Sequence, residues 1–296
     1  MFDPSILFSS LLNGVTTGAV YALIALGLTL IYGVLHIINF AHGAALMAAL
    51  YAVYLLYAKL GVDPYLALPL VTLGMFALGY ALQRFVIGPA SHGRDENILL
   101  VTLGVAILLE NLALVVFKSD TRTIDTAYAF ATVDLGAGIL VAVPELAALA
   151  GALAMTGALY LLIDRTDLGR AIRAVAKERQ GARLVGIDVE HVFALSFGIG
   201  LACVGAAACF LLPSYYVNPS VGSGFVLVAF TIVVLGGMGS FGGALVGGLV
   251  VGLAESIGGL AGITLGWGEN MGQLCIFVVF IAVLLFRPRG LFGARA

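Results

Sequence analysis

Two carboxylates, Glu110 and Glu255, interrupt long apolar stretches of this 296-residue chain. An ionisable side chain in such a stretch is costly to bury, and it commonly marks the path of a polar solute or ion. The alternative is a protonated or hydrogen-bonded glutamate at a helix interface. Since neither stretch offers a basic partner, a proton or sodium relay is disfavoured. Both remain candidate lining of a translocation path, and Glu145 and Glu269, nearer the ends of apolar stretches, are weaker candidates.

A second polar interruption, residues 36–43, contains His36, Asn39 and His42 between two apolar runs. One interpretation is a cytoplasmic turn with an asparagine cap. The other is a broken helix near the middle of the membrane that lines the translocation route. The glycine-rich stretch 236–243 also breaks an apolar run, and we expect it to be the counterpart of the first in a second half. The candidate path residues in these two stretches are Asn39, His42, Gly239 and Gly242.

The sequence lacks the motifs of common enzyme classes. It contains no GxxxxGK[ST] phosphate loop, no HExxH and no GxSxG, and its three cysteines lie in apolar runs without metal-ligand spacing. Gly237, Gly239 and Gly242 match GxGxxG, but no strand or βαβ unit surrounds them, so dinucleotide binding is rejected. We therefore expect no catalytic role, no metal and no cofactor. If transport is driven by ATP, another subunit must bind the nucleotide.

The elements that carry these residues must lie in lipid. Hydrophobic residues make up 61% of the chain and charged residues 10%, whereas soluble domains carry about 25% charged residues. Spanning elements must be helices or a closed barrel, because lipid cannot hydrogen-bond an open backbone. Apolar runs of about 20 residues favour helices. The predicted fold is an all-α, polytopic transmembrane bundle of eight or nine spans, in one domain covering residues 1–296.

The spans follow from the apolar runs, and a Gly88-Pro89 pair is expected to end the third of them. Many of the 39 glycines recur at a spacing of four, which favours close helix packing. The predicted spans cover residues 13–33, 41–57, 65–87, 98–117, 139–163 and 191–212, then two passes within 225–262 with a break near 236–243, and finally 268–286.

Six of the 14 basic residues fall within residues 164–190. Because basic residues concentrate in cytoplasmic loops, we expect this loop and the C-terminal tail to be cytoplasmic and the loop 118–138 to be external. An even number of passes then separates the basic loop from the tail. That favours nine spans with the N-terminus outside.

The basic loop has helical periodicity. Leu168, Ile172 and Val175 recur at the spacing of one helix face. Asp167 is a possible N-cap, and Gly181 or Gly186 are possible ends. One interpretation is a solvated loop that touches lipid headgroups. The other is a short amphipathic helix that docks into a cytoplasmic partner.

Five stretches of the chain are informative together. They are Leu168-Gly-Arg-Ala-Ile-Arg-Ala-Val-Ala, Ala182-Arg-Leu-Val-Gly-Ile-Asp, Gly18-Ala-Val-Tyr-Ala-Leu-Ile-Ala-Leu-Gly-Leu-Thr-Leu-Ile-Tyr-Gly, Ile38-Asn-Phe-Ala-His-Gly and Gly236-Gly-Met-Gly-Ser-Phe-Gly-Gly. These stretches resemble branched-chain amino acid ABC transporter permeases. The resemblance covers essentially the whole chain, in the family's order. Gln180-Gly181 departs from the family's more helix-favouring pair, which blurs the end of the loop helix.

This resemblance implies a subunit of a bacterial plasma (inner) membrane importer for branched-chain or related amino acids. It implies a second permease subunit, two cytoplasmic ATPase subunits that alone bind ATP, and an external substrate-binding protein, all with a lipid bilayer and without nucleic acid. By the same resemblance residues 169–188 couple to the ATPase. The coupling residues it implies are Gly169, Arg170, Arg173, Lys177, Glu178, Arg183, Gly186 and Asp188.

Two alternatives remain at this point. A self-contained secondary transporter or channel needs an ion site or selectivity ring, which the scarcity of charge in the spans disfavours. An intramembrane enzyme needs a catalytic cluster that the sequence does not contain. Other amino acids, urea, short amides and small carboxylates also remain open as substrates.

Overall fold

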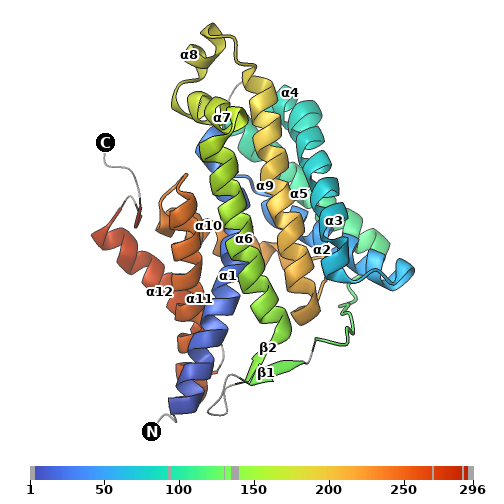
Figure 1. Ribbon diagram of the computed structural model, residues 1–296, viewed down its shortest axis with the longest axis vertical. Helices are drawn as coiled ribbons and strands as arrows, with labels where there is room; N and C mark the ends of the chain where they lie inside the picture. The colour runs from blue at the N-terminus through green and yellow to red at the C-terminus, as the bar shows by residue number, and fades with distance from the viewer. Residues whose placement is uncertain are drawn as a thin grey trace.

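Long apolar helices form nearly all of the protein (Figure 1). The computed structural model describes residues 4–91, 95–129, 131–134, 140–268, 270–288 and 290–292. Within this part, seven helices are long and apolar enough to cross a membrane, and two shorter apolar helices accompany them. The chain is therefore an all-α, polytopic helical bundle, as the sequence predicts.

The spanning helices are α1 (Pro4–Leu35), α2 (Ala41–Leu60), α3 (Pro64–Ala81), α5 (Asp95–Phe117), α6 (Val143–Arg165), α9 (Val189–Leu211) and α11 (Phe241–Thr264). The shorter apolar helices are α10 (Val221–Gly236) and α12 (Met271–Phe286). A π-helix η1 (Leu82–Ile87) and α4 (Gly88–Ser91) prolong α3, and a 3-10 turn η2 (Leu212–Ser214) prolongs α9. Two short helices, α7 (Asp167–Lys177) and α8 (Arg179–Leu184), and an antiparallel strand pair, β1 (Thr132–Asp134) with β2 (Leu140–Ala142), complete the described elements.

The expected stop at Gly88-Pro89 is wrong, because the helical path continues through both residues to Ser91. The π-helix explains why. Gly88 N–H donates to the carbonyl of Gln83, five residues back, so the turn is already widened when it reaches Pro89. Proline lacks the N–H that a regular helix would require at this place.

The predicted break in the glycine-rich stretch is confirmed. Helix α10 ends at Gly236, and α11 begins at Phe241 after the N-cap Ser240, whose hydroxyl accepts from Gly243 N–H at 3.1 Å. Gly237 and Gly239 have φ values of 101° and 84°, which favour glycine. The turn between the two helices is therefore encoded by local residue choice.

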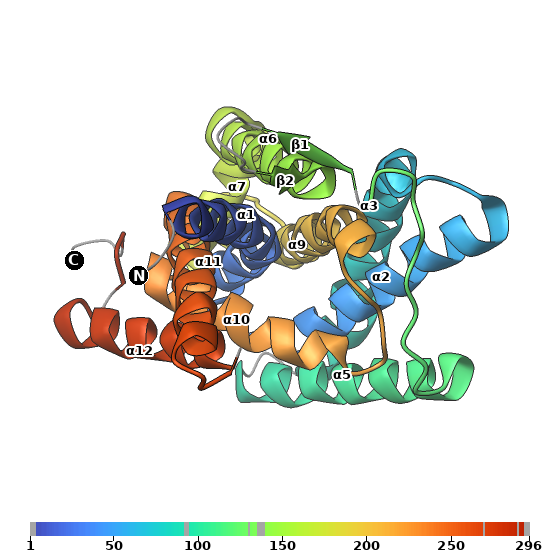
Figure 2. The ribbon, with the colours of Figure 1, turned by 90° about the horizontal axis from the view of Figure 1, so that it is seen from below.

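Helices α1 and α9 lie side by side at the centre of the bundle (Figure 2). They touch backbone to backbone at Gly27 and Gly200, where a Cβ on Gly27 would overlap the carbonyl of Gly200. Helix α11 packs along α1, and α3 packs along α9. Close approach through glycine is a common way for membrane helices to associate.

The packing around α1 and α2 is repeated around α9 and α10, in the second half of the chain. Helix α1 leads into α2 and is covered by α11, whereas α9 leads into α10 and is covered by α3. Helices α2 and α10 cross at Gly43 and Gly222, again with no room for a side chain on either residue. Because α1 and α9 run in opposite directions (Figure 1), the halves form an inverted repeat.

The repeat shows that the expected pairing of residues 36–43 with residues 236–243 is wrong. The structural counterpart of the connection between α1 and α2 is the connection between α9 and α10, which includes η2 and Tyr215. The stretch 236–243 instead corresponds to the link between α2 and α3.

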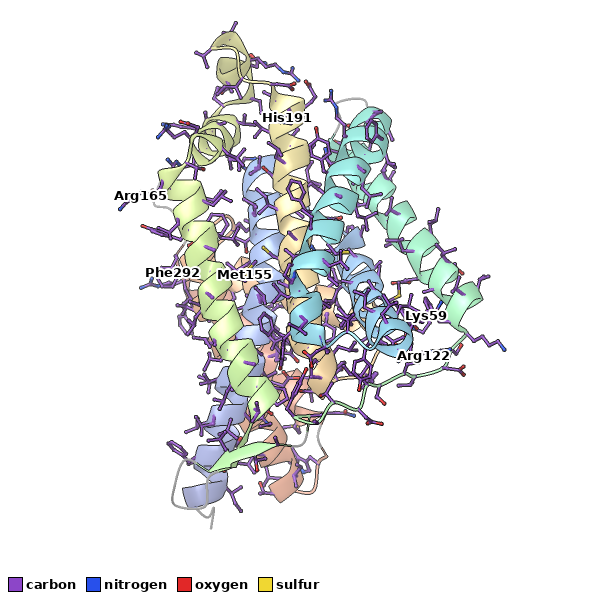
Figure 3. The ribbon with its side chains drawn as sticks, turned by 45° about the vertical axis from the view of Figure 1, so that its right-hand side comes forward. Lys59, Arg122, Met155, Arg165, His191 and Phe292 are labelled. Atoms are coloured by element: carbon purple, nitrogen blue, oxygen red, sulfur yellow. The ribbon has the colours of Figure 1, made fainter. Side chains whose placement is uncertain are left out.

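The two ends of the molecule differ in their elements. Helices α7 and α8 lie at one end, and the start of α1 lies with β1 and β2 at the other (Figure 1). Arg165 and His191 lie toward the first end, and Lys59 and Arg122 lie away from it (Figure 3). The tail also belongs to the first end, because Leu291 N–H donates to Leu235 O at 2.8 Å, where α10 ends.

Candidate functional site

Helix α7 begins at a threonine cap, not at the predicted Asp167. The Thr166 hydroxyl accepts from Gly169 N–H at 3.1 Å, which satisfies one of the free amides of the first turn. The helix ends at Lys177 because Glu178 adopts an extended conformation with φ −156° and ψ 105°. A second helix, α8, follows at once, and Gly186 with φ 86° comes just after it. Of the two glycines proposed as ends, only Gly186 lies at a helix end, and that helix is α8.

The predicted apolar stripe of α7 faces the bundle. Ile172 and Val175 are buried and Leu168 is partly buried. Gly169 lies directly against α6, where a Cβ would overlap the carbonyl of Ile163. The amphipathic pattern therefore gives a helix that is firmly seated at the end of α6.

The arginines of α7 make contacts close to them in sequence. Arg173 donates to the carbonyl of Ile163 and lies 3.6 Å from the Asp164 carboxylate, so it covers the end of α6. Arg170 pairs with Asp167 in the first turn. Lys177 is exposed. The basic side chains of α7 therefore lie outside its apolar stripe, as the sequence predicts.

Three further predicted coupling residues hold the loop in shape. The Glu178 carboxylate accepts from Gln180 N–H at 3.1 Å and caps α8. The Asp188 carboxylate accepts from His191 N–H at 2.9 Å and caps α9. Arg183 bonds to Glu190 at 2.5 Å across the turn between those helices.

The sequence interpretation missed three residues of this region. Arg179 donates to the carbonyl of Leu35 at 2.5 Å, and its guanidinium lies 5.3 Å from the centre of the Phe193 ring. It thus links α8 to the end of α1. Leu184 and Val185 are 88% and 76% exposed at the far end of α8. An apolar pair between Arg183 and Gly186 was the available signal, but neither residue lies on the α7 stripe.

A cavity of about 1030 Å³ separates α7 and α8 from η1 and α4. Its wall carries both signs of charge, with Arg84, Lys177, Arg179 and Arg183 alongside Glu178 and Glu190. The basic loop therefore borders a groove and is not a flat solvated surface.

Asn39 and His42 are fully buried beside α1. Asn39 Oδ1 accepts from Ala41 N–H at 3.0 Å, and His42 Nε2 donates to the carbonyl of Ile24 at 2.9 Å. Since Ile24 lies in the interior of α1, α2 begins partway along the bundle and not at its end. The connection leaves α1 through His36, whose φ of 59° is unusual for a residue other than glycine.

The remaining candidate path residues are spread over the molecule. Gly239 lies against Gly33 near the end of α1, and a Cβ on Gly242 would meet no atom within 4 Å. Glu110 is partly exposed on α5, at the edge of the bundle (Figure 2). Glu255 lies on α11, toward the end opposite α7. The described residues therefore bring Asn39 and His42 together and keep Gly239 near Gly242 at the start of α11, but Glu110 and Glu255 lie on separate helices.

Glu255 lines a cavity of about 870 Å³ at that opposite end. Tyr21 lines the same cavity, and Ser256 Oγ donates to the carbonyl of Ser10 at 2.6 Å. Glu145 lines the same cavity and accepts from the Thr16 hydroxyl at 3.1 Å. Glu269, the other weak candidate, lies outside the described residues.

Tyr215, on the connection that follows η2, also lines this cavity. Burial and then the hydrogen bond with Tyr216 raise the pKa of the Tyr215 phenol above its ordinary value. Tyr215 is therefore a neutral hydrogen-bond donor at physiological pH.

No group of three or more histidine, cysteine or acidic side chains capable of holding a metal ion occurs in the described ranges. Cys203 and Cys209 are buried, and Cys275 is partly buried.

Comparison with known proteins identifies the family. Residues 10–284 match the family model described as branched-chain amino acid transport system / permease component. The high-affinity branched-chain amino acid transport system permease protein BraD of Pseudomonas aeruginosa is 35% identical over 96% of this chain and 94% of its own length. The chain belongs to this permease family.

Two further relatives agree with this assignment. The permease protein LivH of Escherichia coli is 33% identical over 95% of this chain and 94% of that protein. A probable branched-chain amino acid transport permease of Methanocaldococcus jannaschii is 28% identical over 99% of this chain and 92% of its own length. Membership of this family makes the chain a multi-pass transport permease component, and the resemblance drawn from its motifs is confirmed.

Proposed function

We propose that this chain is the transmembrane permease subunit of an ATP-driven importer for branched-chain or related amino acids. The observation that carries this proposal is the full-length family match together with a seated, two-helix element, α7 and α8, at one end of the bundle. The substrate class follows the names of the relatives, and the chain is expected to form the translocation path with a second, homologous or identical permease subunit.

Residues 169–188 are the proposed coupling element. Burial of Ile172 and Val175, the close seat of Gly169 and the contacts of Arg173 would carry a displacement of this element into α6. Arg179 would carry it into the end of α1. Exposed Leu184 and Val185 would offer apolar contact area to one of the two cytoplasmic ATPase subunits, because exposed apolar side chains gather at interfaces. The proposed contact residues are Arg170, Lys177, Arg183 and this apolar pair, with Glu178, Gly186 and Asp188 keeping the shape.

The proposed orientation places α7, α8 and the C-terminus in the cytoplasm and the N-terminus outside a bacterial plasma membrane. Support comes from the concentration of basic residues in 164–190 and from the position of the tail beside the end of α10. An external substrate-binding protein would then meet the end that carries β1, β2 and the start of α1. ATP would be bound by the partner subunits only, and this chain would need no cofactor of its own.

The proposed path takes Asn39 and His42 as buried polar groups in the connection before α2, with Gly239 and Gly242 near its cytoplasmic end. Glu110 and Glu255 would lie along other parts of the route. Support for the first pair is their burial between α1 and α2. A self-contained secondary transporter or channel remains the alternative function.

The coupling assignment is tested by placing a charge on the exposed apolar pair of α8. Leu184→Glu is expected to reduce the amount of ATPase that co-purifies with the chain about tenfold, because interface anchors contribute about 1–2 kcal/mol or more. Leu60→Glu is the matched control, since Leu60 is 70% exposed at the other end of the molecule. Equal ATPase recovery with both variants contradicts the coupling role.

A second measurement separates the two functions. Purified chain without ATPase subunits, reconstituted into liposomes, is expected to show no uptake of leucine under a proton or sodium gradient. Gradient-driven uptake by the chain alone favours the secondary transporter.

A further inference from the structure

Two adjoining cavities near the proposed external end share four lining residues. The larger measures about 870 Å³ and the smaller about 180 Å³. Both are lined by Tyr21, Glu145, Tyr215 and Phe225. These residues belong to α1, α6, the connection after η2, and α10, so the two halves of the repeat meet here.

Three aromatic rings surround this meeting point. The Tyr21 and Phe225 rings stand edge to face with centroids 6.0 Å apart, and the Tyr215 and Phe225 rings do so at 5.5 Å. Ring faces of this kind attract cations, and the attraction is stronger where water is excluded. An aromatic box beside carboxylates is typical of a site for an organic ammonium group.

Two carboxylates face the same space. Glu145 receives one hydrogen bond, from Thr16 at 3.1 Å. The Oε2 atom of Glu255 is buried without a hydrogen-bond partner among the described residues. A buried carboxylate oxygen without a partner is costly, because it has lost water and gained nothing.

The wall supplies no positive charge to offset these groups. None of the described residues that line either cavity is lysine, arginine or histidine. The carboxylates thus leave a place for a cation that the protein does not fill from its own lining.

The rest of the larger cavity suits a zwitterion with an aliphatic side chain. Amide side chains from Asn13, Asn270 and Gln273 line it and can donate to a carboxylate. Asn270 directly precedes α12, whose first turn has free N–H groups that also favour an anion. Apolar wall area comes from Val221, Val228, Leu260 and Ile276.

From this geometry we propose that the cavity is an amino-acid binding site within the permease itself. The primary ammonium group binds between the carboxylates of Glu255 and Glu145, beside the rings of Tyr21 and Tyr215. The substrate carboxylate faces Asn270 and Gln273. This deepens the proposed import function and rests on it, since the amino acid would reach the cavity from the external side.

The direct test measures binding without a substrate-binding protein. The assembled transporter, in phosphatidylcholine nanodiscs, is titrated with radiolabelled leucine by scintillation proximity. Isopentylamine, which keeps the ammonium and lacks the carboxylate, is expected to displace leucine. 4-Methylpentanoate, which keeps the carboxylate and lacks the ammonium, is expected not to do so. Equal displacement by both compounds, or no leucine binding at all, overturns the proposal.

Variants of the two glutamates test whether leucine binds in this cavity. Glu255→Gln and Glu145→Gln are each expected to weaken leucine binding about tenfold, because each removes a charge-assisted contact with the ammonium. Glu255→Asp, which keeps the charge, is expected to retain part of the affinity and so guards against simple misfolding. Asp120→Asn is the matched control, an exposed carboxylate that lines neither cavity. Unchanged binding in Glu255→Gln overturns the proposal.

A lipid headgroup carries the same ammonium chemistry, so a second set of nanodiscs includes phosphatidylethanolamine. Leucine binding is expected to persist in them. Its loss there would assign the cavity to the lipid and overturn the substrate assignment. ATP hydrolysis by the transporter, stimulated by the loaded binding protein, is measured in parallel. Stimulation without leucine binding in the permease would contradict this inference alone, whereas absence of any ATPase in the purified complex would contradict the proposed function.

Discussion

The two polar regions of this permease are built in opposite ways. At the α7 and α8 end, charged side chains contact groups a few residues away, as in Arg170 with Asp167 and Arg183 with Glu190. At the other end, Tyr21, Glu145, Tyr215 and Glu255 come from distant parts of the chain and meet only in the folded bundle. The first region is held mainly by contacts between residues close in sequence, whereas the second forms only when distant helices pack together.

Among the variants that test this difference between the two regions, Gly222→Leu is expected to have the largest effect. Gly222 meets the backbone of Gly43 where α10 crosses α2, so a leucine forces the helices apart. Overpacking at such a contact is expected to cost about 3 kcal/mol or more of unfolding free energy. It should also disturb Phe225 in the cavity wall while leaving α7 seated on α6.

Thermal unfolding in detergent and the leucine titration measure the two effects of Gly222→Leu. Gly104→Leu is the control, because a Cβ there meets no atom within 4 Å. If Gly222→Leu unfolds at the temperature of the parent protein, the crossing is not what holds the cavity together.

Gly169→Val should have the next largest effect, and at the opposite end. Its side chain would overlap the carbonyl of Ile163, so α7 must leave its seat on α6 at a cost of about 1–3 kcal/mol. We expect faster hydrogen exchange over α7 and a lower ratio of transport to ATP hydrolysis.

Leucine binding in the cavity should be unchanged by Gly169→Val. The matched control is Gly157→Val on α6, where the structure has open space. Normal transport per ATP in Gly169→Val would show that the seat of α7 does not matter for coupling.

Arg179→Ala should have an intermediate effect, because Arg179 connects the local structure to the bundle. Loss of its bond to Leu35 and of its contact with Phe193 is expected to lower the free energy of unfolding by about 1.5 kcal/mol and, because the proposed link to α1 is gone, to reduce the transport rate. Uptake by reconstituted transporter measures it. Full activity of the alanine variant would mean that the link to α1 carries no motion.

Arg183→Gln should have the smallest effect on stability. Arg183 and Glu190 are each 60% exposed at the side chain, and exposed ion pairs contribute about 0.2–1 kcal/mol. We expect a shift of unfolding temperature within experimental error, both in low salt and in high salt. A clear loss of stability would show that the loop depends on this pair more than its exposure suggests.

The contrast also explains what the sequence predicts well. Hydrophobic runs identify the helices, and the stripe of Ile172 and Val175 identifies the buried face of α7, because both patterns are local. The break at 236–243 is predicted for the same reason, since glycine marks it in the sequence.

Features that depend on geometry escape such prediction. The choice of Thr166 over Asp167 as cap depends on which side chain reaches an amide, and the π-helix before Gly88 depends on backbone register. The pairing of 36–43 with 236–243 is wrong because it compares residue types, whereas the repeat is defined by packing partners. The sequence pattern does not reveal the roles of Tyr215 and Arg179, since Tyr215 acts through its contact with Phe225 of α10 and Arg179 through its contacts with α1 and α9.

In the inverted repeat, the connection from α1 to α2 corresponds to the connection from α9 to α10. One of them starts at Leu35, whose carbonyl receives Arg179. The other contains Tyr215, which lines the cavity at the far end. The connection that we propose to receive motion from a cytoplasmic partner and the connection that borders the proposed amino-acid site are therefore equivalent parts of the inverted repeat, at opposite ends of the bundle.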